Sequence, residues 1–175
     1  MAPIDSPLTL CLALFACWAL VGAGGLLRPN SVALVGRVLF PLGAVIGVGL
    51  VIVAITSLTQ PVERATLLIG LPDLPMHVRL DNLSRVFLAL LGSASAGVSL
   101  FAAGYFRKGE GTAPGVLGLE YHLFLASMAL VLLADDAYLF MVAWETMAIS
   151  SYFLVTTDHK IPEIRSAGFI YLLIA

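Results

Sequence analysis

Long uncharged runs of apolar residues dominate the chain and predict membrane-spanning helices. A helix needs about 20 residues to cross a hydrocarbon core of about 30 Å. Runs near that length predict five full spans and a sixth that is only about half the length needed to cross. Their expected bounds are about 6–27, 38–60, 86–106, 118–134, 138–156 and 166–175. The predicted fold class is therefore an all-α polytopic membrane protein.

The polar segment between the second and third expected spans follows a different pattern. His77, Arg79 and Asp81 alternate with apolar residues there, and the run Pro-Asp-Leu-Pro at 72–75 separates two stretches of this kind. Alternation with a period of two on either side of a turn predicts a small β-hairpin. An irregular loop is the alternative for this segment.

Two adjacent acids, Asp135 and Asp136, interrupt the apolar pattern in the second half of the chain. Two carboxylates in lipid would be doubly costly, so we expect them in a tight interfacial turn between the fourth and fifth spans. Asp135 is a candidate proton relay, and a solvated turn is the simpler interpretation.

Composition supports the membrane assignment and excludes several function classes. The chain is 60% hydrophobic and 11% charged, whereas a soluble domain has about 45–50% apolar and about 25% charged residues. The net charge of -2 is spread without a basic stripe, so nucleic acid is not an expected partner. The sequence has no nucleotide-binding glycine loop, no cysteine spacing for an iron–sulfur cluster and no paired histidines for a metal, so no cofactor is expected on this chain.

The distribution of Lys and Arg predicts the orientation. Three cations lie in the second loop: Arg64, Arg79 and Arg85. The other six lie in the first, third and fifth loops: Arg28, Arg37, Arg107, Lys108, Lys160 and Arg165. The positive-inside rule then places the N-terminus on the outer side of the cell inner membrane.

Glu145 is the most informative residue, because it lies alone in the uncharged stretch 137–157. It is about 10 Å into the fifth span at 1.5 Å per residue. A charge near the bilayer centre costs roughly 2.5 to 3.5 kcal/mol on insertion scales, so we expect this side chain to face a bundle interior or a water-filled cavity. Burial disfavours the charged form and a nearby cation favours it, so a moving cation would switch Glu145 between two protonation states. Glu145 is thus the predicted proton-translocation residue.

His122, near the start of the fourth span, is a second candidate relay. The alternative is an interfacial histidine with ordinary hydrogen bonds.

Four segments carry a family resemblance: 79–84 (RLDNLS), 123–128 (LFLASM), 143–155 (AWETMAISSYFLV) and 167–171 (AGFIY). In this order they resemble the antiporter-like subunits of respiratory NADH dehydrogenase, membrane-bound hydrogenases and multisubunit cation/proton antiporters of the Mrp type. They are most similar to the branch that contains the B component of hydrogenase-4 and the formate hydrogenlyase membrane subunit. The resemblance implies that residues 1–175 are the N-terminal part of a single, longer transmembrane domain.

The resemblance also implies a function, a proton-translocating membrane subunit of an oxidoreductase complex. In that family the glutamate matching Glu145 pairs with a lysine on a later helix, which here would lie beyond Ala175. Electron transfer would take place in partner membrane and peripheral subunits, at iron–sulfur and nickel–iron or flavin centres. An Mrp-type antiporter subunit and a passive structural subunit are the alternatives. Relatives commonly have Asp-Asn at the turn, so no role is carried onto Asp136.

Overall fold

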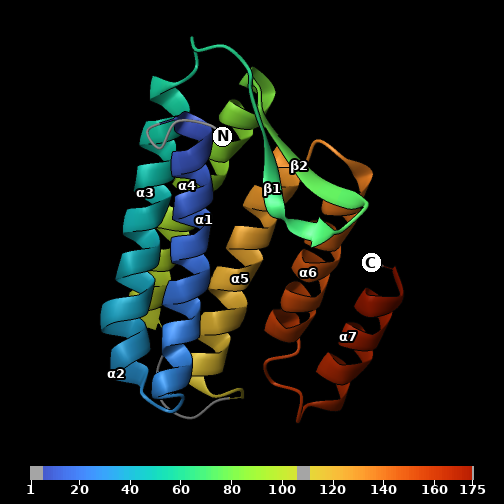
Figure 1. Cartoon of the computed structure of the whole chain (residues 1–175). Helices are drawn as coiled ribbons and strands as arrows, with labels where there is room; N and C mark the ends of the chain where they lie inside the picture. Colours follow the sequence, from blue (N-terminus) through green and yellow to red (C-terminus); the bar gives the residue numbers. More distant parts are fainter. Residues whose placement is uncertain (1–5, 106–110, 175) are drawn as a thin grey trace.

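The computed structural model describes residues 6–105 and 111–174, which form a helical bundle with one β-hairpin across its end (Figure 1). In chain order the elements are α1 (Pro7–Gly24), η1 (Gly25–Leu27), α2 (Val32–Leu34), η2 (Val35–Leu39), α3 (Phe40–Thr56), β1 (Glu63–Leu71), β2 (Leu74–Leu80), α4 (Asn82–Tyr105), α5 (Pro114–Leu133), α6 (Ala137–Val155) and α7 (Pro162–Ile174). Within the described residues, five helical segments are long and apolar enough to cross a membrane: Pro7–Leu27, Val32–Thr56, Asn82–Tyr105, Pro114–Leu133 and Ala137–Val155. The predicted fold class is confirmed.

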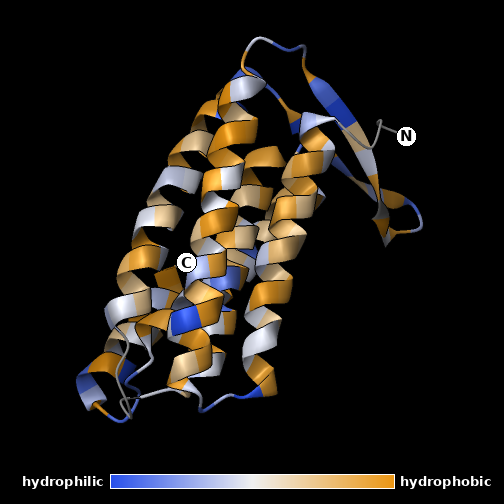
Figure 2. Ribbon diagram, turned by 90° about the vertical axis from the view of Figure 1, so that its left-hand side faces the viewer, coloured by the Kyte–Doolittle hydropathy of each residue, from blue (hydrophilic) through white to orange (hydrophobic). Residues whose placement is uncertain are grey.

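Helices α1, α3, α4 and α5 form a four-helix core, α6 packs on α5, and α7 packs on the outer side of α6 (Figure 1). The largest fully buried side chains include Trp18 of α1, Phe40 and Leu50 of α3, and Leu133 of α5. Apolar residues also cover much of the outside of the helices, while hydrophilic residues gather toward the two ends and in the hairpin (Figure 2). An apolar outer surface of this kind is suited to lipid or to further helices.

The predicted hairpin is confirmed, and the irregular loop is not observed. Strands β1 and β2 pair in antiparallel fashion around a two-residue turn at Pro72 and Asp73, with an irregular register between Thr66 and Gly70. An isolated β-bridge then joins Val78 of β2 to Ala134, after the end of α5. The hairpin is therefore attached to the α5–α6 turn as well as to α3 and α4.

Three arginines that the charge pattern placed in loops lie in helices. Arg37 is an exposed residue of η2, a π-helical segment, Arg85 is buried in the first turn of α4, and Arg165 is exposed in the first turn of α7. The Arg85 guanidinium donates to the carbonyls of Gln60 (2.8 Å) and Pro61 (2.7 Å). A long cationic side chain near a helix end can reach water or carbonyl groups. A helix can therefore begin several residues before the uncharged run that predicts it.

Small residues set the distance between α3 and α4. A Cβ added at Gly92 would lie 2.6 Å from the Gly47 carbonyl oxygen and 2.9 Å from a methyl of Val51. A Cβ added at Gly47 would lie 2.8 Å from the Gly92 carbonyl oxygen. Such contacts let two backbones approach closely, which favours helix association inside a membrane.

This close approach predicts opposite effects for two glycines of the same helix. Gly92→Ala should lower the free energy of unfolding by about 1–3 kcal/mol, because the added methyl overpacks the α3–α4 contact. Gly97→Ala is the matched control, since a Cβ there meets nothing within 4 Å, and its better helix propensity should leave stability equal or higher. Thermal unfolding in detergent, followed by circular dichroism, would measure both; equal melting temperatures would contradict the packing assignment.

Candidate functional site

The start of α6 is fixed by Asp136, and this sets the depth of Glu145. The Asp136 backbone is extended, and its Oδ1 accepts a hydrogen bond from the Leu139 N–H at 2.7 Å, as an N-cap residue does. Glu145 then follows eight residues after Ala137 and ten residues before Val155. At 1.5 Å per residue it lies about 12 Å from one end of α6 and about 15 Å from the other, close to the middle.

The carboxylate of Glu145 points away from the described bundle. The α6 residues packed toward α5 include Leu139, Ala143 and Ser150, which are buried, and Glu145 is about 200° around the helix from Ala143. Its side chain is exposed and makes no hydrogen bond or ion pair with a described residue. Among the described residues Glu145 is not covered: α7 packs on the same side of α6, against Tyr152 and Thr156, and leaves the Glu145 side chain exposed.

Helix α7 packs on the side of α6 that carries Glu145, nearer to the α6–α7 turn. The Tyr171 hydroxyl donates to Ser151 Oγ at 2.9 Å, and Gly168 packs against Thr156 and Tyr152. A cavity of about 250 Å³ lies between the two helices, lined by Trp144, Met147, Ala148, Tyr171 and Ile174. This cavity borders the residue immediately before Glu145, and its walls are mainly apolar.

His122 is fully buried in the four-helix core. Its Nδ1 donates to the Gly118 carbonyl at 2.7 Å, and this hydrogen bond leaves Nε2 as the position that can gain or lose a proton. Nε2 makes no hydrogen bond with a described residue. The ring fits against α3 where Gly43 has no side chain, since a Cβ there would lie 2.5 Å from Nε2.

Further polar contacts surround His122 at the same level of the bundle. The hydroxyls of Tyr121 and Ser99 are 2.9 Å apart and join α5 to α4. The Trp18 indole donates to the Gly43 carbonyl at 3.2 Å and joins α1 to α3. The four-helix core is therefore crossed by hydrogen bonds rather than being uniformly apolar.

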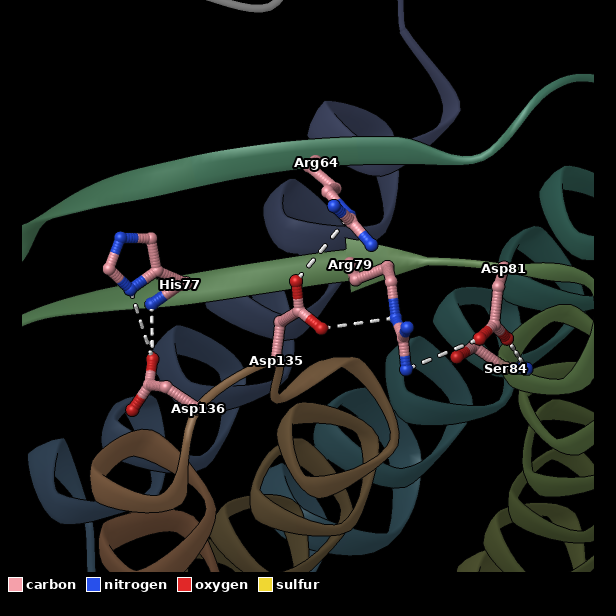
Figure 3. Close-up of polar contacts among 7 residues, drawn as sticks. All are labelled: Arg64, His77, Arg79, Asp81, Ser84, Asp135 and Asp136. Carbon is pink, nitrogen blue, oxygen red and sulfur yellow. Dashed lines mark hydrogen bonds and ion pairs between the residues drawn. The ribbon is translucent and has the colours of Figure 1, made fainter.

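Asp135 and Asp136 occupy the turn between α5 and α6, as predicted, and Asp135 is bound to the hairpin. Its carboxylate lies 3.2 Å from Arg79 Nε and 3.6 Å from Arg64 Nε (Figure 3). The Asp135 N–H donates to the His77 carbonyl. The two arginines come from adjacent strands, so one carboxylate holds both. This arrangement gives Asp135 an anchoring role; its role as a proton relay stays a prediction.

Asp136 holds the other side of the same junction. Besides capping α6, its carboxylate accepts the His77 N–H and lies 3.5 Å from the His77 ring (Figure 3). Partial burial alone would raise the pKa of Asp136, but the N–H groups of Leu139 and His77 outweigh it and hold the pKa below the ordinary value of 3.8. The Ser84 N–H likewise lowers the pKa of Asp81, which caps α4.

The sequence pattern missed one ionisable residue inside a span, Glu120 of α5. The structure begins α5 at Pro114, four residues before the expected start, so Glu120 lies well inside the helix. Its Oε2 is buried and has no hydrogen-bond partner among the described residues. The signal was present, since Glu120 is the one acid within Pro114–Leu133. Within the described part of the chain, no three His, Cys, Asp or Glu side chains are grouped as a metal site would require.

Comparison with known proteins gives the family. No family model matches the chain. A Mycobacterium tuberculosis protein named only as uncharacterized is 37% identical over 127 residues, which are 72% of this chain and 19% of that protein. Hydrogenase-4 component B of Escherichia coli is 33% identical over 100 residues, 57% of this chain and 15% of the relative. NADH-quinone oxidoreductase subunit L of Buchnera aphidicola (31% over 88 residues, 50% and 14%) and the putative antiporter subunit mnhA2 of Staphylococcus aureus (31% over 84 residues, 48% and 10%) also match.

The chain belongs to the antiporter-like membrane subunit family. The stretches that match make up less than a fifth of the length of these relatives. Together with the five apolar helices, membership identifies a multi-pass membrane protein. The relatives named for a function are components of hydrogenase, NADH-quinone oxidoreductase and antiporter assemblies, so this antiporter-like chain is related to subunits of multisubunit membrane complexes.

The lowered pKa of Asp136 predicts how the hairpin contact depends on pH. Stability from this carboxylate is present above its ordinary pKa of 3.8 and is lost as the pH falls through the lowered folded-state value. Backbone amides of β2 should therefore exchange hydrogen slowly near neutral pH and lose protection below about pH 4.

Asp136→Ala should remove that protection already at neutral pH. Asp73→Ala, at the exposed hairpin turn, should keep it and is the matched control. Hydrogen exchange with mass spectrometry measures the β2 amides, and equal protection in the two variants would contradict the role of Asp136.

Proposed function

We propose that this chain is part of a proton-translocating membrane subunit of an oxidoreductase complex of the hydrogenase-4, formate hydrogenlyase or NADH-quinone oxidoreductase type. Electron transfer in partner membrane and peripheral subunits would be coupled to proton movement through the antiporter-like subunit. The relatives in hydrogenase-4 and NADH-quinone oxidoreductase support this assignment.

One observation carries the proposal, namely a carboxylate at the middle of a membrane-spanning helix with no counter-charge among the described residues. Left ionised against lipid, Glu145 would cost several kcal/mol. The exposed face of α6 is therefore suited to contact with protein or water. A cation that approaches this face favours the carboxylate and releases its proton, and a cation that withdraws favours proton uptake. The family resemblance supplies a lysine as this cation.

His122 is proposed as an additional proton relay. Its Nε2 is buried and unpaired among the described residues, and its Nδ1 is held by the Gly118 carbonyl. The fixed ring can gain and lose a proton at one nitrogen without losing its position. Redox centres of the iron–sulfur, nickel–iron or flavin type are proposed for the partner subunits, and this chain supplies the proton-carrying groups.

The proposed location is the cell inner membrane with the N-terminus outside. The three arginines found in helices do not alter the charge count, because Arg37, Arg85 and Arg165 remain near the ends at which they were counted. Six Lys and Arg residues remain on the side of the first, third and fifth loops, and three remain on the hairpin side. The three on the hairpin side make hydrogen bonds or ion pairs to other residues there. The positive-inside bias therefore continues to support this orientation.

An Mrp-type cation/proton antiporter subunit is the second candidate, because a putative antiporter subunit is 31% identical over 84 residues. The two functions differ in what drives the proton. Proteoliposomes without any redox substrate should show no pH change on addition of sodium or potassium if the oxidoreductase proposal holds. A cation-dependent pH change would favour the antiporter.

Glu145→Gln tests the main proposal, because it keeps the side-chain shape and removes the titratable proton. Proton translocation by the reconstituted complex should fall by about 100-fold or more, the typical contribution of a positioned acid–base group. Complex assembly and electron transfer to an artificial acceptor should stay near wild-type levels. Glu163→Gln is the matched control, since Glu163 is exposed in the first turn of α7. Wild-type pumping in Glu145→Gln would reject the proposal and indicate a structural subunit.

A further inference from the structure

Glu120 is a second carboxylate in the membrane-spanning part of the chain. It lies six residues after Pro114, about 9 Å into α5. The residue is half-buried, and its Oε2 is buried without a hydrogen-bond partner among the described residues. A buried carboxylate oxygen with no donor is costly when ionised, whereas a protonated acid is neutral and carries a donor of its own.

The contacts of its neighbours show which way Glu120 points. His122 and Leu119 lie against Gly22 of α1, and Tyr121 bonds Ser99 of α4. Glu120 is about 160° around α5 from His122 and so faces neither α1 nor α3. The remaining helix packed along α5 is α6. Ser127, two turns further along and within about 20° of Glu120, is buried on the same side.

The antiparallel register of α5 and α6 gives the residues that Glu120 meets. Leu117 and Leu154 line one cavity of about 320 Å³, which also reaches Tyr121 and, at the α6–α7 turn, Thr157. Counting one turn from Leu117 along α5 and one turn back from Leu154 along α6 brings Glu120 level with Ser150 and Ser151.

On this register Glu120 lies level with polar residues of four helices. We define this transverse polar layer by its members, which are Ser99 of α4, Tyr121 and Glu120 of α5, Ser150 and Ser151 of α6, and Tyr171 of α7. Its outer steps are observed hydrogen bonds, Ser99 to Tyr121 and Tyr171 to Ser151, each 2.9 Å long. Glu120 is the acid of the layer, and Tyr121, His122 and Tyr171 are the other titratable groups beside it.

We propose that Glu120 is a second proton-carrying carboxylic acid, which exchanges protons with the aqueous end at the α6–α7 turn on the α5-facing side of α6, opposite Glu145. Glu120 is about 9 Å from that end and Glu145 about 15 Å, so the two acids lie at successive depths. In the transfer the Glu120 O–H bond breaks and the proton moves to a water or hydroxyl oxygen, after which a proton from the aqueous side restores the acid. No electrons move.

This inference rests on the proposed function, so the experiment separates the two. In the purified complex, infrared difference spectroscopy near neutral pH should show the C=O stretch of a protonated carboxylic acid that is lost in Glu120→Gln and kept in Glu145→Gln and Glu163→Gln. Proton translocation should fall at least about tenfold in Glu120→Gln, by the reasoning for positioned acids. Glu120→Asp, which retains a carboxylic acid, should restore part of the rate.

A wild-type complex without that C=O band, or a Glu120→Gln complex that pumps like Glu163→Gln, would overturn the role of Glu120 and leave the proposal for Glu145 standing. A wild-type complex that moves no protons would instead reject the proposed function. If Glu120→Gln fails to assemble, Glu120→Asp decides, because this variant keeps the acid. A shifted C=O band with a reduced pumping rate in Glu120→Asp supports the role of Glu120, and wild-type pumping without the band overturns it.

Discussion

The cost of placing charge in hydrocarbon governs the arrangement of this chain. Most of the ionisable residues within 6–105 and 111–174 lie at the ends of the helices or in the hairpin, where they are exposed or paired. Buried Arg85 lies at a helix end and uses its guanidinium to hold the carbonyls of Gln60 and Pro61. Within the described residues, Glu120 and Glu145 are the acids that lie inside membrane-spanning helices. Neither forms an ion pair with another described residue. Their positions are understandable only if protons, water or further protein neutralise them.

The features that follow from length and composition were predictable from the sequence. Uncharged runs gave five spans, period-two alternation gave the hairpin, and the cost of two acids gave the turn at Asp135 and Asp136. Helix starts were less predictable, because a charge in the first turn can be satisfied by nearby carbonyls or by water. The Asp81 cap, with its contact to the Ser84 N–H, is the local signal that begins α4 before Arg85.

The orientation of side chains depended on packing and could not be obtained from one sequence. Glu145 was expected inside the bundle, yet α5 contacts another face of α6, and α7 packs against Tyr152 and Thr156 without covering Glu145. Glu120 was overlooked because a single acid near a span boundary changes mean hydropathy little. Its significance arises from packing, which buries one carboxylate oxygen. The partner of Asp135 was likewise invisible, since Arg64 and Arg79 meet it only through the strand pairing of β1 with β2.

The hairpin contact also bears on how the membrane insertion of the chain proceeds. Arg64, His77 and Arg79 precede Asp135 and Asp136, so during synthesis from the N-terminus they are made first. When α5 and α6 enter the bilayer as a helical pair, the acids of their connecting turn arrive at a surface where cationic and N–H partners are already present. The hairpin thus provides a binding surface for the turn. Binding of the two acids to this surface opposes their return through the hydrocarbon.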